Sequence, residues 1–163
     1  YIANVGENDL ANVQENQEYL HLKKQAESEN AKIIPVCAKV EEDLSSLTAE
    51  EKQLFMEELQ IKESGLDQLI KATYELLGLE TFYTSGKDEC RAWTFKKGMK
   101  APQCAGIIHS DFERGFIKAE VYHFQDLLQY QSEQAVKENG KCRLEGKEYV
   151  MKDGDIVYFK FNV

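Results

Sequence analysis

Apolar residues in the first half of the chain form two short continuous runs with a long polar segment between them. Residues 1–5 and 32–37 are runs of the kind that buried parallel strands show. The segment between them predicts a helix that ends near Glu29 and is capped by Asn8 or Asp9. Strand, helix and strand at this spacing predict a βαβ unit. Because two parallel strands cannot cover both faces of a sheet, we expect this unit to belong to a larger sheet.

Two further helices are expected before residue 80. Thr48 and Glu51 have the spacing of a capping box, which predicts a helix start at that point. Ser64 is expected to cap a second helix, and Gly78 stands where a left-handed C-terminal cap belongs. The apolar positions of this second helix are spaced mainly three and four residues apart, which is typical of an amphipathic helix. They are Leu66, Leu69, Ile70, Tyr74 and Leu77.

The periodicity changes after residue 80, where alternating apolar and polar residues predict β-strands separated by short turns. The predicted strands are 81–85, 90–96, 116–122, 143–144, 148–151 and 156–161. Helices are expected at 103–109 and 124–139, and turns at 86–89 and at Asp153-Gly154. A hairpin, helices and further strands over about 80 residues predict a small mixed sheet with helix packed on one face.

The composition is that of a globular protein, with 42% apolar and 30% charged residues over 163 positions. This length suits one ordinary domain or two small ones. The longest apolar run, 33–38, is far shorter than a membrane helix, so no membrane partner is expected. The four cysteines include no Cys-x-x-Cys pair and the three histidines are dispersed, so no metal site is predicted. Scattered cysteines without a secretory leader indicate free thiols in a cytoplasmic protein.

Charge is distributed unequally along the chain, whose net charge is −9 at pH 7. Residues 1–80 contain 7 Lys and Arg against 17 Asp and Glu, a net of −10. Residues 81–163 contain 13 against 12, a net of +1. Because a strongly acidic surface repels a polyanion, only the second half is expected to approach an RNA backbone, and no DNA binding is expected.

Two strand ends carry residues with the spacing of a nucleotide-base site. Residues 4–7 are Asn-Val-Gly-Glu, and residues 35–39 are Pro-Val-Cys-Ala-Lys. In P-loop GTPases an N-K-x-D motif and an S-A-K motif contact the base from two such strand ends. The first segment here resembles the N-x-x-E variant of the YchF (Obg-like) ATPase family, which prefers ATP to GTP.

The chemistry of the base agrees with this resemblance. An Asp at the fourth motif position accepts hydrogen bonds from guanine N1–H and N2–H₂, groups that adenine lacks, and Glu7 is one methylene too long for that contact. An Asn amide pairs with adenine N6 and N7, and we assign this role to Asn4. Lys39 either stacks its stem on the base or is a solvated lysine. The expected base contacts come from Asn4, Val5, Glu7, the backbone of Cys37 and Ala38, and Lys39.

A second resemblance lies in the second half. Segments 91–95, 101–117, 146–149 and 153–155 resemble the TGS domain of the same family, most specifically in His-Ser-Asp-Phe-Glu-Arg-Gly-Phe-Ile at 109–117. The two resemblances together cover essentially all residues. They imply α/β and α+β folds: the remnant of a P-loop NTPase sheet over 1–80 and a β-grasp (ubiquitin-like) TGS domain over 81–163. They also imply a ribosome or RNA partner.

No segment matches Gly-x-x-x-x-Gly-Lys-[Ser/Thr], the loop that holds nucleotide phosphates and contributes a ligand to Mg²⁺. The resemblance therefore implies that ATP and Mg²⁺ are cofactors of a full-length parent ATPase. This chain alone is predicted to contain no catalytic residues and to be inactive, and we expect it to begin within a domain. The alternative is a TGS-containing binding module of a tRNA synthetase or a stringent-response enzyme, which would have no base-recognition motif.

Basic residues gather around the predicted strand 90–96, interleaved with Trp93 and Phe95. They are Arg91, Lys96, Lys97 and Lys100. Aromatic and basic side chains on one face predict an RNA- or ribosome-binding surface. The alternative is a solvated strand face whose two aromatic residues point into the core. The adjacent residues 109–111, His-Ser-Asp, have the types of a catalytic triad, but triad members converge from separate elements, so a structural turn is expected there.

Overall fold

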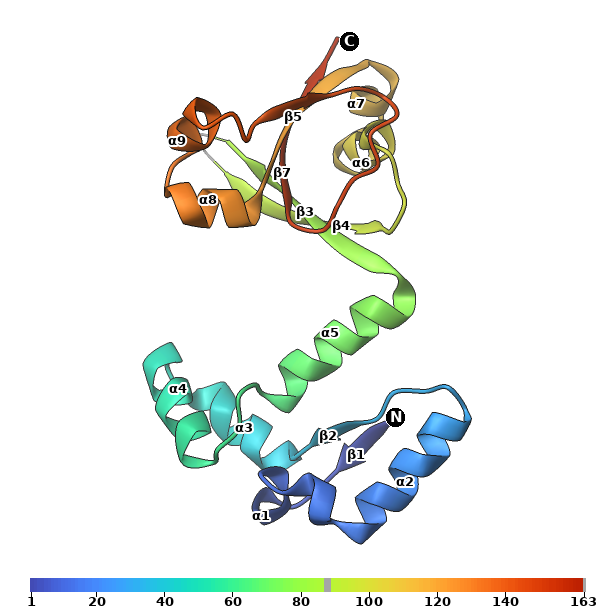
Figure 1. Ribbon diagram of the computed structural model, residues 1–163, viewed down its shortest axis with the longest axis vertical. Coiled ribbons are helices and arrows are strands. Elements are labelled where there is room, and N and C mark those ends of the chain that lie inside the picture. Colours follow the sequence, from blue (N-terminus) through green and yellow to red (C-terminus); the bar gives the residue numbers. More distant parts are fainter. Residues whose placement is uncertain (87–88, 163) are drawn as a thin grey trace. The chain divides into compact units, whose positions relative to one another are not determined.

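A computed structural model of the protein describes residues 1–86 and 89–162, and the chain divides into two compact units. Unit 1 is Tyr1–Thr73 and unit 2 is Tyr74–Val163. This division lies within helix α5 (Gly65–Leu77), a few residues before the boundary expected at residue 80 (Figure 1). None of the described helices is long and apolar enough to span a membrane.

Unit 1 contains the predicted βαβ arrangement. Strands β1 (Ile2–Asn4) and β2 (Ile34–Val36) pair in parallel, with Ala3 opposite Pro35. The single long helix expected between them is wrong, because the chain forms three shorter elements. These are α1 (Glu7–Leu10), the 3-10 helix η1 (Val13–Glu15) and α2 (Gln17–Ser28).

The cap expected at Asn8 or Asp9 is also wrong, since α2 is capped by Asn16. Its side chain accepts a hydrogen bond of 3.0 Å from the Tyr19 N–H. Asn side chains compete locally for backbone hydrogen bonds, so a run containing Asn12 and Asn16 interrupts a helix more readily than its polarity alone indicates.

Helices α3 (Ala38–Ser46), α4 (Ala49–Glu58) and α5 follow β2. Helix α3 was not predicted, because Val40 and Leu44 are its only two buried residues and two positions do not define a period. The capping box at the start of α4 is confirmed: Glu51 N–H donates to Thr48 Oγ1 at 3.4 Å and Thr48 N–H donates to Glu51 Oε2 at 2.8 Å. The Ser64 cap and the left-handed Gly78 (φ 61°) are confirmed as well.

Unit 2 is built on one five-stranded mixed sheet, in the order β4-β3-β7-β5-β6. Its strands are β3 (Leu79–Ser85), β4 (Cys90–Lys96), β5 (Phe116–His123), β6 (Arg143–Glu145) and β7 (Asp155–Phe161). The first and last strands, β3 and β7, run parallel at the centre, and the other neighbours are antiparallel. This is the predicted β-grasp arrangement. The strand expected at 148–151 is wrong, since only one bridge, Lys100 to Val150, forms there. The turn expected at 86–89 includes residues 87–88, which lie outside the described part.

Helices cover both faces of this sheet, and not one face as expected (Figure 1). Helices α6 (Ala101–Ile108) and α7 (Ser110–Arg114) pack on one face, and α8 (Phe124–Tyr130) and α9 (Glu133–Glu138) pack on part of the other. The single helix predicted over 124–139 is broken because Gln131 is left-handed (φ 60°) and Ser132 caps a new helix.

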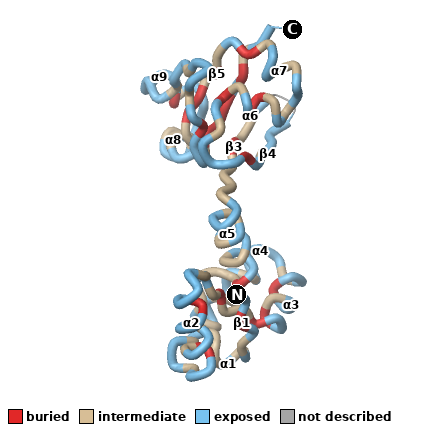
Figure 2. Tube along the Cα trace, turned by 90° about the vertical axis from the view of Figure 1, so that its right-hand side faces the viewer, coloured by how far each residue is buried: buried red, intermediate tan, exposed pale blue. Residues whose placement is uncertain are grey.

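The main core lies between the sheet and α6 (Figure 2). Phe82 is fully buried at its centre, with ring centroids 5.9 Å from those of both Phe95 and Phe159. The sulfur of Cys104 also lies in this core, where burial raises the pKa of its thiol to about 12.

This burial predicts selective cysteine chemistry. A thiol of such high pKa in a closed core carries almost no thiolate, so Cys104 should resist alkylation in the folded chain. Cys90 is exposed and should react rapidly with iodoacetamide at mildly alkaline pH. Peptide mass spectrometry after a short pulse of reagent measures both. Equal labelling of the two cysteines in the native protein would contradict the burial of Cys104.

Candidate nucleotide-binding site

The two expected base-binding segments lie side by side at the carboxyl ends of the two strands of unit 1. Asn4 ends β1 and is paired with Val36, which ends β2. The Val5 N–H donates to the Val36 carbonyl at 2.9 Å, so the parallel pairing continues just past the end of β1. Open parallel sheets bind their ligands at the carboxyl ends of the strands, which is where these two segments lie.

Asn4 links the two segments directly. Its side-chain oxygen Oδ1 accepts a hydrogen bond of 3.2 Å from the Ala38 N–H, at the first position of α3. Cys37 precedes that helix without a side-chain cap, so Asn4 supplies the acceptor that a capping residue would provide. Among the described residues, the Asn4 Nδ2 group has no partner and remains a donor for a ligand.

Glu7 and Lys39 form a second link across the same gap. Lys39 Nζ lies 3.0 Å from Glu7 Oε2, and this hydrogen bond, with the charges of Glu7 and Asp43, raises the pKa of Lys39. The side chain of Lys39 is 72% exposed and that of Glu7 is 38% exposed, so both can be approached from solvent. Neither alternative for Lys39 included this contact, which places its ammonium group on Glu7.

The remaining residues of the expected site differ in what they can offer. Cys37 is buried at 4% exposure and its thiol packs with Val40 and Leu44, so only its backbone is available to a base. Val5 is half-buried and follows Asn4 out of β1. The arrangement therefore presents one amide donor, one carboxylate held by a lysine, and the backbone at the start of α3.

The sequence left two alternatives for β4: an aromatic and basic stripe on the surface, or a solvated face whose two aromatic residues point into the core. Phe95 is 2% exposed and points into the core, and the indole Nε1–H of Trp93 donates to Thr84 Oγ1 at 3.0 Å. The Arg91 guanidinium covers the Trp93 ring at 4.2 Å. Strand alternation directs both rings to the core side, so the alternative of a solvated strand face with two aromatic residues in the core holds, and bases do not stack on Trp93 and Phe95.

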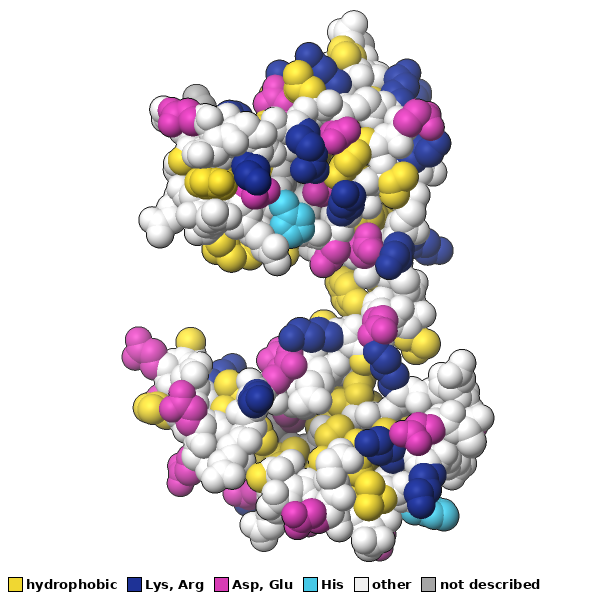
Figure 3. Space-filling model, in the orientation of Figure 1, with side chains coloured by type: hydrophobic (Ala, Val, Ile, Leu, Met, Phe, Trp, Pro, Cys, Tyr) yellow, Lys and Arg dark blue, Asp and Glu magenta, His cyan; other side chains and the backbone are white. Residues whose placement is uncertain are grey.

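Two of the four basic residues are paired with carboxylates. Lys97 lies 3.7 Å from Glu80, and Lys100 lies 2.6 Å from Glu148. On the face drawn in Figure 3, the Lys and Arg side chains of unit 2 are interleaved with Asp and Glu. Binding of RNA by Arg91, Lys96, Lys97 and Lys100 stays a prediction.

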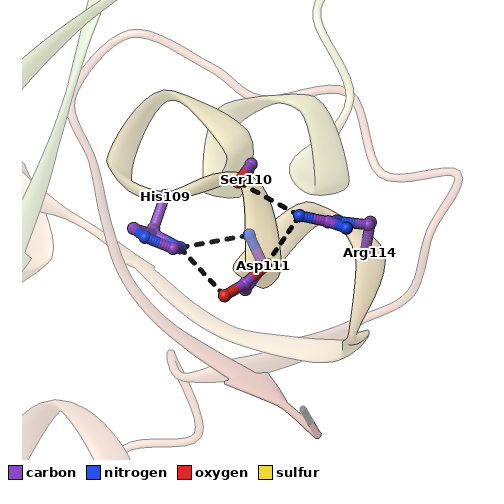
Figure 4. Close-up of polar contacts among 4 residues, drawn as sticks. All are labelled: His109, Ser110, Asp111 and Arg114. Carbon is purple, nitrogen blue, oxygen red and sulfur yellow. Dashed lines mark hydrogen bonds and ion pairs between the residues drawn. The ribbon is translucent and has the colours of Figure 1, made fainter.

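The His-Ser-Asp segment forms a structural turn, as expected (Figure 4). His109 Nδ1 accepts a hydrogen bond of 3.2 Å from the Asp111 N–H and so caps α7. The Arg114 guanidinium donates to Asp111 Oδ1 at 2.8 Å and to Ser110 Oγ at 3.4 Å. The hydroxyl of Ser110 thus contacts an arginine and not the imidazole, which is not the geometry of a nucleophile with its base.

Comparison with known proteins agrees with this fold. A family model named YchF-GTPase_C, described as "Protein of unknown function (DUF933)", matches residues 79–162. The structure of the Schizosaccharomyces pombe YchF GTPase superposes with a TM-score of 0.86 at 40% identity, over 98% of this chain and 42% of that one. A GTP-binding protein from Pyrococcus horikoshii OT3 gives a TM-score of 0.66 at 19% identity, over 99% of this chain and 45% of that one, which supports the fold alone.

Curated relatives match along the whole chain. The ribosome-binding ATPase YchF of Bacillus subtilis (strain 168) is 59% identical, over 100% of this chain and 44% of that protein. The protein of the same name from Escherichia coli O157:H7 is 49% identical, with the same coverage. Obg-like ATPase 1 of Gallus gallus is 45% identical, over 99% of this chain and 41% of that protein.

The fold and these likenesses define the class first: a βαβ unit and a β-grasp sheet of the kind found in GTP-binding proteins. Within that class, the chain belongs to the YchF family. It spans less than half the length of the curated relatives that it matches.

Proposed function

We propose that this chain is the C-terminal part of a cytoplasmic, ribosome-associated regulatory ATPase that binds ATP in preference to GTP. The observation that carries the base site is the pair of links between the ends of β1 and β2, from Asn4 to Ala38 and from Lys39 to Glu7. The ribosome partner is supported by the names of the bacterial relatives, which are ribosome-binding ATPases. This family assignment favours the ATPase over a binding module of a tRNA synthetase.

In this proposal the Asn4 side chain donates from Nδ2 to the base. Its Oδ1 already accepts from the Ala38 N–H, so the Nδ2 group is the donor to the base, and purine N7 is the acceptor that fits this donor. Both adenine and guanine carry N7, and Asn4 alone therefore cannot select ATP. Selection rests on the fourth motif position, where Glu7 is longer than the Asp that guanine requires and is held by Lys39.

The phosphates and Mg²⁺ are assigned to the longer protein. A phosphate-binding loop is absent from the 163 residues, so this chain offers contacts to the base alone. Bound in the longer protein, Mg²⁺ would supply positive charge that offsets the charge of the phosphates, and we assign none of its ligands to this chain.

The purified 163-residue chain is accordingly expected to show no ATP hydrolysis and only weak ATP binding, because most polar contacts to a nucleotide are made by its phosphates. A phosphate-release assay and calorimetric titration with ATP and GTP measure both. The full-length protein is the positive control and should hydrolyse ATP and bind it more tightly than GTP. Turnover by the fragment, or a full-length protein that prefers GTP, would overturn the proposed function.

A further inference from the structure

One face of the sheet in unit 2 is only partly covered. Helices α8 and α9 pack over Tyr83, Tyr122 and Ile156 and leave the neighbouring strand positions open. Tyr158 on β7 is 62% exposed and Leu144 on β6 is 64% exposed. Strand alternation puts Tyr158 on this face, since its neighbours Val157 and Phe159 lie in the core on the other side. Leu144 is on the same face, because Leu144 and Tyr158 are both cross-strand partners of Glu120. We call this region the open face.

Lysines on the open face lie close to one another despite their like charges. Lys118 on β5 and Lys160 on β7 are direct cross-strand partners, a position in which like charges destabilise a sheet. Lys160 forms an ion pair with Glu120, and Lys137 on α9 lies 2.6 Å from Glu133. Lys118 has no ion-pair partner among the described residues. The five groups carry three positive and two negative charges, which leaves a local excess of one.

The electrostatics of Glu120 report the same convergence. Its pKa is lowered by the hydrogen bond from Lys160, and further by the charges of Lys160, Lys137 and Lys118, against the opposing effect of burial. The charges of three lysines therefore act on one carboxylate, and Lys160 contacts it directly. An anionic ligand would relieve the repulsion that this carboxylate only partly offsets.

A groove of about 640 Å³ lies in this region, and three of the five charged groups, Glu120, Glu133 and Lys137, line it. Its buried apolar lining is Tyr122, Ile156 and Val157. The exposed Tyr158 lines it as well, and Lys160 Nζ lies 6.0 Å from the centroid of the Tyr158 ring. The region thus combines a flat exposed ring, an apolar hollow and a lysine pair. A single-stranded nucleic acid needs these features: a surface on which bases stack and cations that follow the backbone.

From this juxtaposition we propose that the open face binds single-stranded RNA, with a base stacked on Tyr158 and adjacent phosphates at Lys118 and Lys160. The proposal rests on the proposed function, because it makes ribosomal RNA the component that unit 2 contacts. It replaces the stripe on β4, whose rings are turned to the core. An acidic peptide would use the lysines but would gain little from Tyr158, and so it can be distinguished by experiment.

The test uses the 163-residue chain and a fluorescent, unstructured RNA oligonucleotide, with affinity measured by anisotropy. Tyr158→Ala should weaken binding about 5- to 100-fold, whereas Tyr158→Phe keeps the ring and should bind like the parent chain. Lys118→Gln should weaken binding and reduce the slope of log affinity against log salt by about 0.7. Lys147→Gln removes one charge from an exposed loop position elsewhere in unit 2 and is the matched control.

Glu120→Gln gives a result of opposite sign. Removing this carboxylate leaves Lys160 free for a phosphate, so RNA affinity should rise several-fold. A general loss of folding cannot produce that increase. Because Tyr158 and Lys118 lie on the surface side of the strands, circular dichroism should confirm that each variant remains folded.

The possible outcomes distinguish failure of the open face as an RNA site from failure of the proposed function. No effect of Tyr158→Ala, or equal effects of Lys118→Gln and Lys147→Gln, would overturn the open face as the RNA site. Dependence on Lys118 and Glu120 without dependence on Tyr158 would indicate an acidic peptide and would also overturn it. Ribosome co-sedimentation of the full-length protein tests the proposed function separately. If the full-length protein and its Tyr158→Ala variant pellet with ribosomes equally well, only the open face is refuted. If the full-length protein never pellets with ribosomes, ribosome association is refuted.

Discussion

Replacing Gly115 by alanine is expected to destabilise unit 2 by about 2–3 kcal/mol, because the new methyl group has no room. A Cβ built on Gly115 would overlap the carbonyl oxygen of Asn162, which belongs to the backbone and cannot turn aside. The same two residues are joined by a hydrogen bond of 2.9 Å from the Asn162 N–H to the Gly115 carbonyl. Accommodating the methyl group would separate β5 from β7 near Phe116, where the strand register already shifts.

Urea denaturation followed by the fluorescence of Trp93, the only tryptophan, measures this loss of stability. Gly146→Ala is the matched control, since nothing lies within 4 Å of a Cβ at that position, and it should change stability by less than about 0.5 kcal/mol. Equal midpoints for the Gly115→Ala and Gly146→Ala variants would show that the contact between Gly115 and Asn162 is not tight.

Local signals allowed much of the fold to be predicted. The capping box at Thr48 and the glycine at Gly78 act within a few residues of themselves, so sequence specifies them directly. The break at Gln131 was missed because the helical pattern continues through it, and the left-handed backbone there is favoured by the Ser132 cap of the next helix. The strand expected at 148–151 failed for the opposite reason: its apolar residue Met151 is buried, but in a loop.

The candidate sites show a similar division. Asn4 and Glu7 can be recognised from the sequence alone because they belong to one motif of four consecutive residues. The contacts that they make with Ala38 and Lys39 depend on the parallel pairing of β1 with β2. The opposition of Lys118 and Lys160 depends on the register of β5 against β7, which a pattern along one strand does not contain.

The direction in which the β4 aromatic residues point also depends on tertiary packing. Alternation places Arg91, Trp93 and Phe95 on one side of the strand but does not say which side faces the core. Packing on Phe82 and α6 decides it, with Phe95 buried and Trp93 packed against the same core. A surface for RNA was therefore one of two alternatives for β4, whereas the exposed ring of Tyr158, with Lys160 beside it, belongs to β7.

The double substitution Val5→Lys with Glu7→Asp is expected to shift the full-length protein toward GTP by about tenfold or more. It rebuilds the N-K-x-D pattern and places a shorter carboxylate where guanine N1–H and N2–H₂ can both donate, a bidentate contact worth about 1–3 kcal/mol. The shorter Asp side chain is also expected to lose the 3.0 Å contact that Glu7 makes with Lys39, which frees the carboxylate for the base.

Competitive titration of both nucleotides gives the ATP to GTP affinity ratio of each variant. Val5→Lys alone is the control, because it changes the charge beside the site and leaves the Glu7 carboxylate with Lys39. Its ratio should stay near that of the parent protein, while the double variant moves toward GTP. Asn4→Ala should weaken both nucleotides to a similar degree, since N7 is common to the two bases. If the double variant keeps the parent ratio, Glu7 does not select the base.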